Sequence, residues 1–192
     1  MTLTKRQNQI VEIAIKLIAL HGIQNLTIKN LSNEIGISEP ALYRHFKSKY
    51  DILNAVIDFF IQKTKPALES LKEISNPINA IEKFINNHLE IFEKNHNLAR
   101  IIFSESNFQN EERLLKKLKN LMQNSQEVLE DIISKGQNQG KIRNDISSTS
   151  IFRLIIGSLR FLVTQWSISQ MNFNLKTEGN SLFNDILKII KV

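Results

Sequence analysis

The sequence predicts an all-α protein, in which an N-terminal module of three helices precedes a larger helical domain, with about nine helices in total. Apolar residues recur at intervals of three and four, as on the buried side of a helix, and do not alternate as they do in strands. Six glycines and three prolines among 192 residues leave few positions that interrupt helices. With 42% hydrophobic residues, the chain can bury a core of its own.

The first predicted helix covers residues 4–21. His21 and Gly22 mark its end, because glycine readily adopts the backbone conformation that closes a helix. Five apolar residues recur on one side and are expected to form its buried face: Ile10, Ile13, Ala14, Leu17 and Ile18.

Residues 27–49, TIKNLSNEIGISEPALYRHFKSK, predict a helix, a tight turn and a second short helix. Thr27 would cap the first of these helices, and Leu31 and Ile35 lie four residues apart, as helical core contacts do. Gly36 follows where the chain needs a residue that accepts positive φ. This order is typical of a helix-turn-helix motif.

The second helix of this motif is expected to follow Ser38, whose hydroxyl can accept from free backbone amides, with Pro40 in its first turn. Leu42 and Phe46 would form its buried edge. An arginine that pairs with guanine, a phenol, an imidazole and a small apolar side chain suit DNA bases and phosphates. The outward residues that supply them would be Ala41, Tyr43, Arg44 and His45.

A longer helix is expected from Ser48, with Asp51 as its partner in a capping box and with Pro66 as its end or as a kink. Asn76 and Pro77 predict the start of another helix. The buried face of the long helix would carry Ile52, Ala55, Val56, Phe59 and Phe60. Further helices are expected over residues 98–103, 111–135, 148–171 and 178–191.

The helix over residues 148–171 is apolar nearly all round, so it must be covered on two sides. One side can contact the chain's own core. The other side, together with the last helix, favours a four-helix contact with a second copy of the chain. The expected dimer interface consists of Ile151, Ile155, Ser158, Leu162, Phe183, Leu187 and Ile190.

Positive charge is concentrated near the N-terminus. Of the net charge of +6, residues 1–50 carry +4, from seven Lys and Arg against three Asp and Glu, and the other 142 residues carry +2. Such a concentration beside a helix-turn-helix motif is typical of a DNA-binding module.

The sequence offers no catalytic or metal-binding site, and we expect no cofactor. It contains no cysteine, which excludes disulfides, thiolate ligands and cysteine nucleophiles. Its histidines are His21, His45, His88 and His96, and no two have the i, i+4 spacing of a helical metal site. We therefore expect a protein that is not an enzyme, with an enzyme that binds a small molecule as the less favoured alternative.

No membrane partner is expected, and the predicted location is the cytoplasm. Glu12 and Lys16 interrupt the N-terminal apolar run, and no small-residue cleavage site follows, so this run predicts a helix rather than a signal peptide. The later apolar segment carries Arg153 and Arg160 within a length that is already short for a bilayer.

A basic helix, then TIKNLSNEIGIS, then SEPALYRHFKSK leading into a long helix resembles the TetR family of bacterial transcription regulators, specifically over residues 10–60. The resemblance implies a DNA-binding domain over residues 1–47 and a ligand-binding and dimerisation domain over residues 48–192. It implies a homodimeric repressor that binds a palindromic double-stranded DNA operator and that an effector releases. By position, the DNA contacts would be Thr27, Ser38, Glu39, Pro40, Ala41, Tyr43, Arg44, His45 and Lys49.

The effector is expected to be a small hydrophobic or amphipathic molecule, because eleven phenylalanines in a helical chain could line an apolar cavity. Each candidate is also an ordinary core residue by its spacing. The candidates are Phe60, Phe84, His88, Phe103, Ser125 and Gln165.

The principal alternative is a helical dimeric interaction protein without DNA binding. It would keep the expected dimer and would leave the outward residues of the helix-turn-helix unused. Binding to duplex DNA with a steep salt dependence separates the two.

Overall fold

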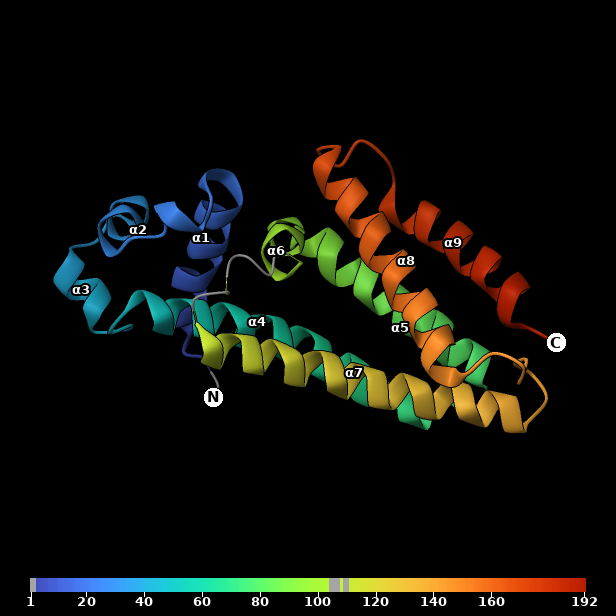
Figure 1. Ribbon diagram of the computed structural model, residues 1–192. Coiled ribbons are helices and arrows are strands. Elements are labelled where there is room, and N and C mark those ends of the chain that lie inside the picture. The colour runs from blue at the N-terminus through green and yellow to red at the C-terminus, as the bar shows by residue number, and fades with distance from the viewer. Residues whose placement is uncertain (1–2, 104–107, 109–110) are drawn as a thin grey trace. The chain divides into compact units, whose positions relative to one another are not determined.

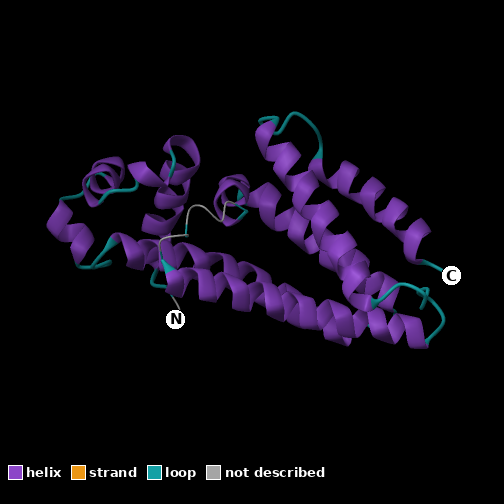
Figure 2. Cartoon of the chain, viewed as in Figure 1, coloured by secondary structure: helices purple, strands orange, loops and turns teal. Residues whose placement is uncertain are grey.

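The structure is a computed structural model that describes residues 3–103, 108 and 111–192. Within these residues it contains nine α-helices and no strand, which confirms the predicted fold class (Figure 1). Loops and two 3₁₀ turns, Ile23–Asn25 and Leu71–Glu73, join them (Figure 2). The helices are α1 (Lys5–His21), α2 (Ile28–Ile35), α3 (Glu39–Tyr43), α4 (Lys49–Ser70), α5 (Pro77–Lys94), α6 (His96–Ile102), α7 (Glu112–Asn138), α8 (Ser148–Ile168) and α9 (Leu175–Ile190).

The chain forms two compact units, and α4 and α7 contribute residues to both. Unit 1 comprises Met1–Gln62 and Asn97–Lys119, and unit 2 comprises Lys63–His96 and Asn120–Val192. Each unit therefore combines segments that are distant in the sequence. The division at residues 47 and 48 concerns function, and it stays a prediction.

Helix α1 has the reciprocal cap expected of a capping box. The hydroxyl of Thr4 accepts from the backbone N of Gln7 at 3.2 Å, and the side chain of Gln7 accepts from the backbone N of Thr4 at 3.0 Å. The helix ends at Gly22, whose φ is 79°. Ile10 is fully buried on the inner face and Ile13 is partly exposed. The predicted first helix is confirmed.

The helix-turn-helix follows the predicted signals closely. Thr27 Oγ1 accepts from the backbone N of Asn30 at 3.0 Å at the start of α2. The helix closes at Gly36, which has φ 76° and ψ 36° in the left-handed region that favours glycine. Ser38 Oγ then accepts from the backbone N of Ala41 at 3.4 Å and begins α3. Local hydrogen bonds therefore fix both helix starts and the turn.

Helix α4 begins as predicted but continues further. Ser48 Oγ accepts from the backbone N of Asp51 at 3.2 Å, and the Asp51 carboxylate accepts from the backbone N of Lys47 at 3.0 Å. Of the two outcomes expected for Pro66, an end or a kink, the end is wrong, since α4 runs through Pro66, and the kink stays a prediction. Leu68 beyond the proline is only 6% exposed, and its burial outweighs the one backbone hydrogen bond that proline removes.

In unit 2, α5 lies against α9 and α8, and α8 lies against α9 (Figure 1). Gly179 permits a close approach of α9 to α5, because a Cβ at this position would overlap the side chain of Leu89. Helix α9 begins at Leu175, so the predicted start at residue 178 is too late. The reason is the side chain of Asn174, which accepts from a backbone amide in the first turn at 2.8 Å.

Helix α8 has a buried side and an exposed apolar side. Ile155 is completely buried, whereas Phe161 is 65% and Ile168 is 74% exposed. Among the described residues, α8 is the helix long and apolar enough to cross a bilayer, by length and composition alone, and 39% of its most apolar stretch is buried. Core helices of folded proteins have the same composition. The protomer itself therefore leaves part of this apolar helix uncovered.

Candidate DNA-binding surface and effector region

Helix α3 presents a mixed polar and apolar face to solvent. Glu39, Pro40, Tyr43 and Arg44 are exposed, with Tyr43 at 48%. Leu42 on the opposite side is completely buried and anchors the helix. A short helix that is anchored on one side and polar on the other can place side chains on base edges in a major groove.

The other residues predicted to contact DNA are hydrogen-bonded within the protein or partly buried. Thr27 and Ser38 are exposed, but each hydroxyl already accepts from a backbone amide as a helix cap. Because a hydroxyl also carries a proton, it can donate to a phosphate while it caps. Ala41 and His45 are partly buried, and the carbonyl oxygen of His45 accepts from Gln7 Nε2 at 3.2 Å.

The side chain of Lys49 is hydrogen-bonded within the protein. Its Nζ donates to the carbonyl oxygen of Ile23 at 2.7 Å, and its side chain is partly buried. Desolvation by this burial lowers the pKa of Lys49 below its usual 10.5. The hydrogen bond connects the start of α4 to the 3₁₀ turn after α1, a contact that the sequence did not predict.

Two further cations in unit 1 join helices that are distant in the sequence. Lys117 on α7 donates from Nζ to Asn54 Oδ1 at 2.6 Å and lies 2.8 Å from Asp58 Oδ1, and both partners are on α4. Arg100 on α6 donates to the carbonyl oxygen of Ala19 on α1 at 3.1 Å. Sequence reasoning missed both contacts because no local pattern marks a partner 63 or 81 residues away.

Of the six predicted effector residues, Phe84 and His88 are in contact with each other. Their ring centroids on α5 lie 4.1 Å apart, with ring planes at 42°. His88 Nδ1 donates to the carbonyl oxygen of Phe84 at 2.9 Å. Burial lowers the pKa of His88 below its usual 6.5, and this outweighs the opposite effect of that hydrogen bond. The ring is therefore neutral at neutral pH, and its Nε2 is a hydrogen-bond acceptor.

The other four candidates lie on different helices and loops. Phe60 is 6% exposed in unit 1, and Phe103 is partly buried in the same unit. In unit 2, Ser125 is partly buried on α7 and its hydroxyl donates to the carbonyl oxygen of Leu121 at 3.2 Å. Gln165 is exposed on α8. The burial of Phe60 is what an ordinary core residue would have.

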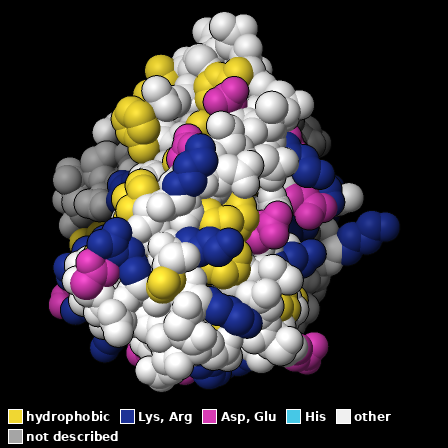
Figure 3. Space-filling view, turned by 90° about the vertical axis from the view of Figure 1, so that its right-hand side faces the viewer, with side chains coloured by type: hydrophobic (Ala, Val, Ile, Leu, Met, Phe, Trp, Pro, Cys, Tyr) yellow, Lys and Arg dark blue, Asp and Glu magenta, His cyan; other side chains and the backbone are white. Residues whose placement is uncertain are grey.

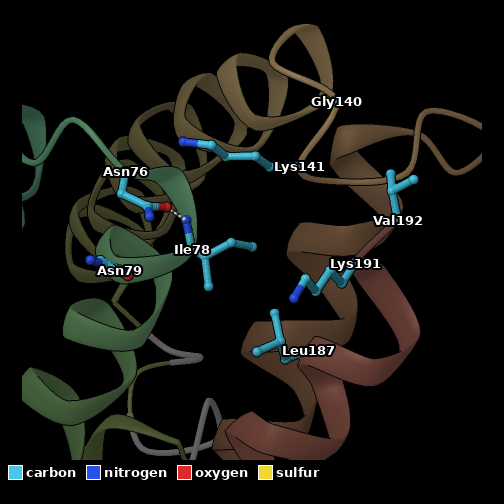
Figure 4. Close-up of a pocket in the computed structure, with 8 residues that line it drawn as sticks. All are labelled: Asn76, Ile78, Asn79, Gly140, Lys141, Leu187, Lys191 and Val192. Atoms are coloured by element: carbon cyan, nitrogen blue, oxygen red, sulfur yellow. Dashed lines mark hydrogen bonds between the residues drawn. The ribbon is translucent and has the colours of Figure 1, made fainter.

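None of these candidates lines either of two surface hollows, and no sequence signal marked the hollows. One of about 390 Å³ in unit 1 is lined by Tyr50 and residues 111–113. One of about 310 Å³ in unit 2 lies between the start of α5, the loop after α7 and the end of α9 (Figure 4). Its lining residues are Asn76, Ile78, Asn79, Gly140, Lys141, Leu187, Lys191 and Val192.

Charged side chains of both signs are scattered over one face of the molecule (Figure 3). On the face drawn in Figure 3, lysine and arginine side chains alternate with acidic side chains and small apolar patches. The described residues contain no group of three or more His, Cys, Asp and Glu that could hold a metal ion.

Four of the seven residues predicted at the dimer interface are buried within the protomer. Their side chains are at most 7% exposed, and the interface itself stays a prediction. Helical periodicity located the apolar sides of α8 and α9, but it could not tell which apolar side faces inward. The four core residues are Ile151, Ile155, Phe183 and Ile190. The other three are partly exposed: Ser158, Leu162 and Leu187.

Comparison with known proteins supports the helix-turn-helix and extends the likeness to the rest of the chain. Residues 10–56 match the bacterial regulatory proteins of the tetR family, and residues 53–189 match the YsiA-like protein C-terminal region. The fatty acid metabolism regulator protein of Bacillus subtilis (strain 168) is 26% identical over 178 residues, which cover 91% of this chain and 90% of that protein.

Solved structures share the fold of this chain. The structure of the ketosteroid transcriptional regulator KstR2 of Mycobacterium tuberculosis has a TM-score of 0.84 at 18% identity, and the match covers 100% of this chain and 97% of the KstR2 chain. FadR from Bacillus subtilis, in complex with stearoyl-CoA, has a TM-score of 0.80 at 23% identity. The match covers 94% of this chain and 97% of the FadR chain. Because its two family matches together span residues 10–189, the chain belongs to the tetR family of bacterial regulatory proteins and is a DNA-binding transcriptional regulator.

Proposed function

We propose that the protein is a homodimeric repressor that leaves a palindromic operator when a fatty acyl thioester, such as a long-chain acyl-CoA, binds its C-terminal region. The observation that carries the proposal is the helix-turn-helix, in which Gly36 makes the turn and Tyr43 at the end of α3 and the following Arg44 are exposed. The functional division lies at residues 47 and 48, where the helix-turn-helix gives way to α4.

The recognition surface acts through base edges and phosphates. Arg44 donates to a guanine, because its fork of N–H groups fits the guanine edge. Glu39 either accepts from a cytosine amine or supports the first turn of α3 as a negative charge at a helix start. The surface consists of Thr27, Ser38, Glu39, Pro40, Ala41, Tyr43, Arg44 and His45.

The second protomer covers the outer side of α8. Gly157 on this side has open space around its Cα, and Phe161 is 65% exposed one turn later. An exposed apolar stripe with a glycine lets a helix of a second copy approach closely. Ser158, Leu162 and Leu187, which are partly exposed, extend this surface.

The fatty acyl effector is favoured by the 26% identical relative over nearly the whole chain, since that protein is named a fatty acid metabolism regulator. The FadR structure of the same fold holds stearoyl-CoA. In this chain, Phe84 offers an apolar surface, and the neutral His88 accepts from an N–H or O–H group of the effector. The other proposed contacts are Phe60, Phe103, Ser125 and Gln165.

Such a regulator acts in the cytoplasm, where bacterial DNA and acyl thioesters meet, and it catalyses no reaction. Its effector releases DNA only if it binds one arrangement of the two recognition helices more tightly than the other. The two helices must lie about 34–36 Å apart to enter successive major grooves. A coupling of about 1–3 kcal/mol, or roughly 5- to 150-fold in operator affinity, is ordinary for this kind of switch.

The proposal is tested by selecting duplexes from a random-sequence library with the purified protein and measuring their affinity at several salt concentrations. We expect a palindromic duplex, bound less tightly as salt rises. Stearoyl-CoA should then release it, whereas CoA alone and stearate should not.

The possible failures have different meanings. If no duplex is enriched while the protein is dimeric, the regulator is contradicted and the interaction protein without DNA binding is supported. If a duplex is enriched but stearoyl-CoA leaves it bound, the acyl thioester is the wrong effector and the DNA-binding function stands.

A further inference from the structure

Lys49 is the first residue of α4, and its side chain points back into the DNA-binding module. Its Nζ donates to the carbonyl oxygen of Ile23 at 2.7 Å. The same oxygen accepts from the backbone N of Leu26 at 3.1 Å, so the lysine uses the second lone pair of a carbonyl in the 3₁₀ turn. This one contact connects α4 with the turn that separates α1 from α2.

Three hydrogen bonds from other side chains also fix the segment between α3 and α4. Gln7 Nε2 on α1 donates to the carbonyl oxygen of His45 at 3.2 Å. The Asp51 carboxylate accepts from the backbone N of Lys47 at 3.0 Å, and Ser48 Oγ accepts from the backbone N of Asp51 at 3.2 Å. Helix α3 has only five residues, and so short a helix keeps its direction through tertiary contacts rather than through its own backbone.

We infer that Lys49 is a positioning residue that sets the orientation of α3 by fixing the start of α4 to the turn at Ile23, and that it does not act as a phosphate contact. The inference rests on the DNA-binding function. One of the three N–H donors of the Lys49 ammonium group is bonded to the Ile23 carbonyl at 2.7 Å, and the side chain is partly buried, so it is directed into the module. Lys47, two residues earlier, is exposed.

The two roles differ in their salt dependence. A lysine that neutralises a phosphate releases a counterion, so its removal lowers the slope of log affinity against log salt by about one and weakens binding to all sequences alike. A positioning lysine leaves the number of phosphate contacts unchanged. Its removal misdirects α3, so it weakens binding to the selected duplex and leaves binding to unrelated sequence unchanged.

The first experiment compares Lys49→Met with Lys49→Arg, and uses Lys47→Met as the matched control. Each protein is titrated with the duplex that the wild type enriches and with a scrambled duplex, at several salt concentrations and at a temperature where circular dichroism shows it folded. For Lys49→Met we expect about tenfold lower affinity for the enriched duplex, with the salt slope and the scrambled-duplex affinity unchanged. Lys49→Arg, which can still donate to the carbonyl, should restore most of the loss.

Two results would overturn the inference. A salt slope lower by about one, with both duplexes weakened, makes Lys49 a phosphate contact. Unchanged affinity for the enriched duplex leaves Lys49 with a role in folding alone.

The second experiment needs no DNA. Amide hydrogen exchange of the free protein is followed in peptides that cover residues 39–48. We expect faster exchange in Lys49→Met than in the wild type, and no change in Lys47→Met, because of these two lysines it is Lys49 whose side chain is bonded within the module, whereas Lys47 is exposed. Unchanged exchange in Lys49→Met contradicts the inference even if the wild type enriches no duplex, a result that would itself contradict DNA binding.

Discussion

At the residue scale, the side chains that the sequence predicted correctly act on their own neighbourhood. Thr27 and Ser38 accept from amides three residues ahead, and Gly36 has the left-handed conformation that its place in the turn requires. The residues that it missed make contacts with residues far away in the sequence. Lys49 bonds to Ile23, and Gly179 packs closely beside Leu89. The range of the interaction therefore decided which residues could be predicted.

Replacing Gly179 with alanine should destabilise unit 2. The added methyl group would overlap Leu89, which is 1% exposed and has little room to move. We expect a loss of about 1–3 kcal/mol in the free energy of unfolding, measured by urea denaturation. The double variant Gly179→Ala with Leu89→Ala should show a smaller cost than the sum of the single variants. Strict additivity would mean that the two side chains do not meet.

His88 should make the protein less stable in mild acid. Its pKa lies below the usual 6.5 in the folded chain, mainly because the partly buried ring is desolvated, so the unfolded chain takes up the proton first. The contribution of neutral His88 is fully present above pH 6.5 and is lost as the pH falls through the lower folded pKa. Urea denaturation of His88→Gln and the wild type between neutral and acidic pH checks this. Equal pH dependence in the two proteins would contradict it.

Among the helices, α4 is the one on which the proposed mechanism depends, because it begins at the DNA-binding module and continues into unit 2. Its start is fixed by Lys49, and its first half is fixed by Lys117 from α7. The Lys117 and Asp58 side chains are 25% and 17% exposed, so their ion pair is screened less than a surface pair. Helix α7 therefore holds α4 by a polar contact that a small displacement would break.

Lys117→Met should be far more costly than a similar change at the surface. The variant leaves Asp58 partly buried without its cation, and we expect a loss of about 1–3 kcal/mol in the free energy of unfolding. Lys188→Met is the matched control, since Lys188 also lies 2.8 Å from its partner Asp185 but the two side chains are 76% and 64% exposed. That control should cost less than about 1 kcal/mol. Equal losses in urea denaturation would argue against a special role for the α4–α7 contact.

At the scale of the whole molecule, one protomer accounts for only part of the apolar surface of α8. Phe161 and Ile168 are exposed on the side that does not face the core. A palindromic operator is read by two recognition helices at a fixed spacing, and the second of these helices must come from a second copy of the chain. Both observations favour a dimer formed through the outer side of α8.

A charge on this surface should separate the protomers. We expect Phe161→Glu to weaken the dimer by at least about tenfold, because the carboxylate would be buried without a partner. Met122→Glu is the control, since Met122 on α7 is 62% exposed and Phe161 is 65% exposed. Sedimentation velocity over a range of concentrations checks both variants. A Phe161→Glu protein that stays dimeric would place the interface elsewhere.

Sequence patterns were sufficient to predict that the chain is helical, where α1 to α4 begin, how the turn at Gly36 is made and which side of α3 faces out. These features depend on helical periodicity and on hydrogen bonds within a few residues. The packed structure was needed to show that Ile151 and Phe183 are buried in the protomer, that α4 continues through Pro66 and that Lys49 is bonded to Ile23. A periodic apolar stripe does not specify which element packs against it, and contacts between residues far apart in the chain exist only after the helices have packed.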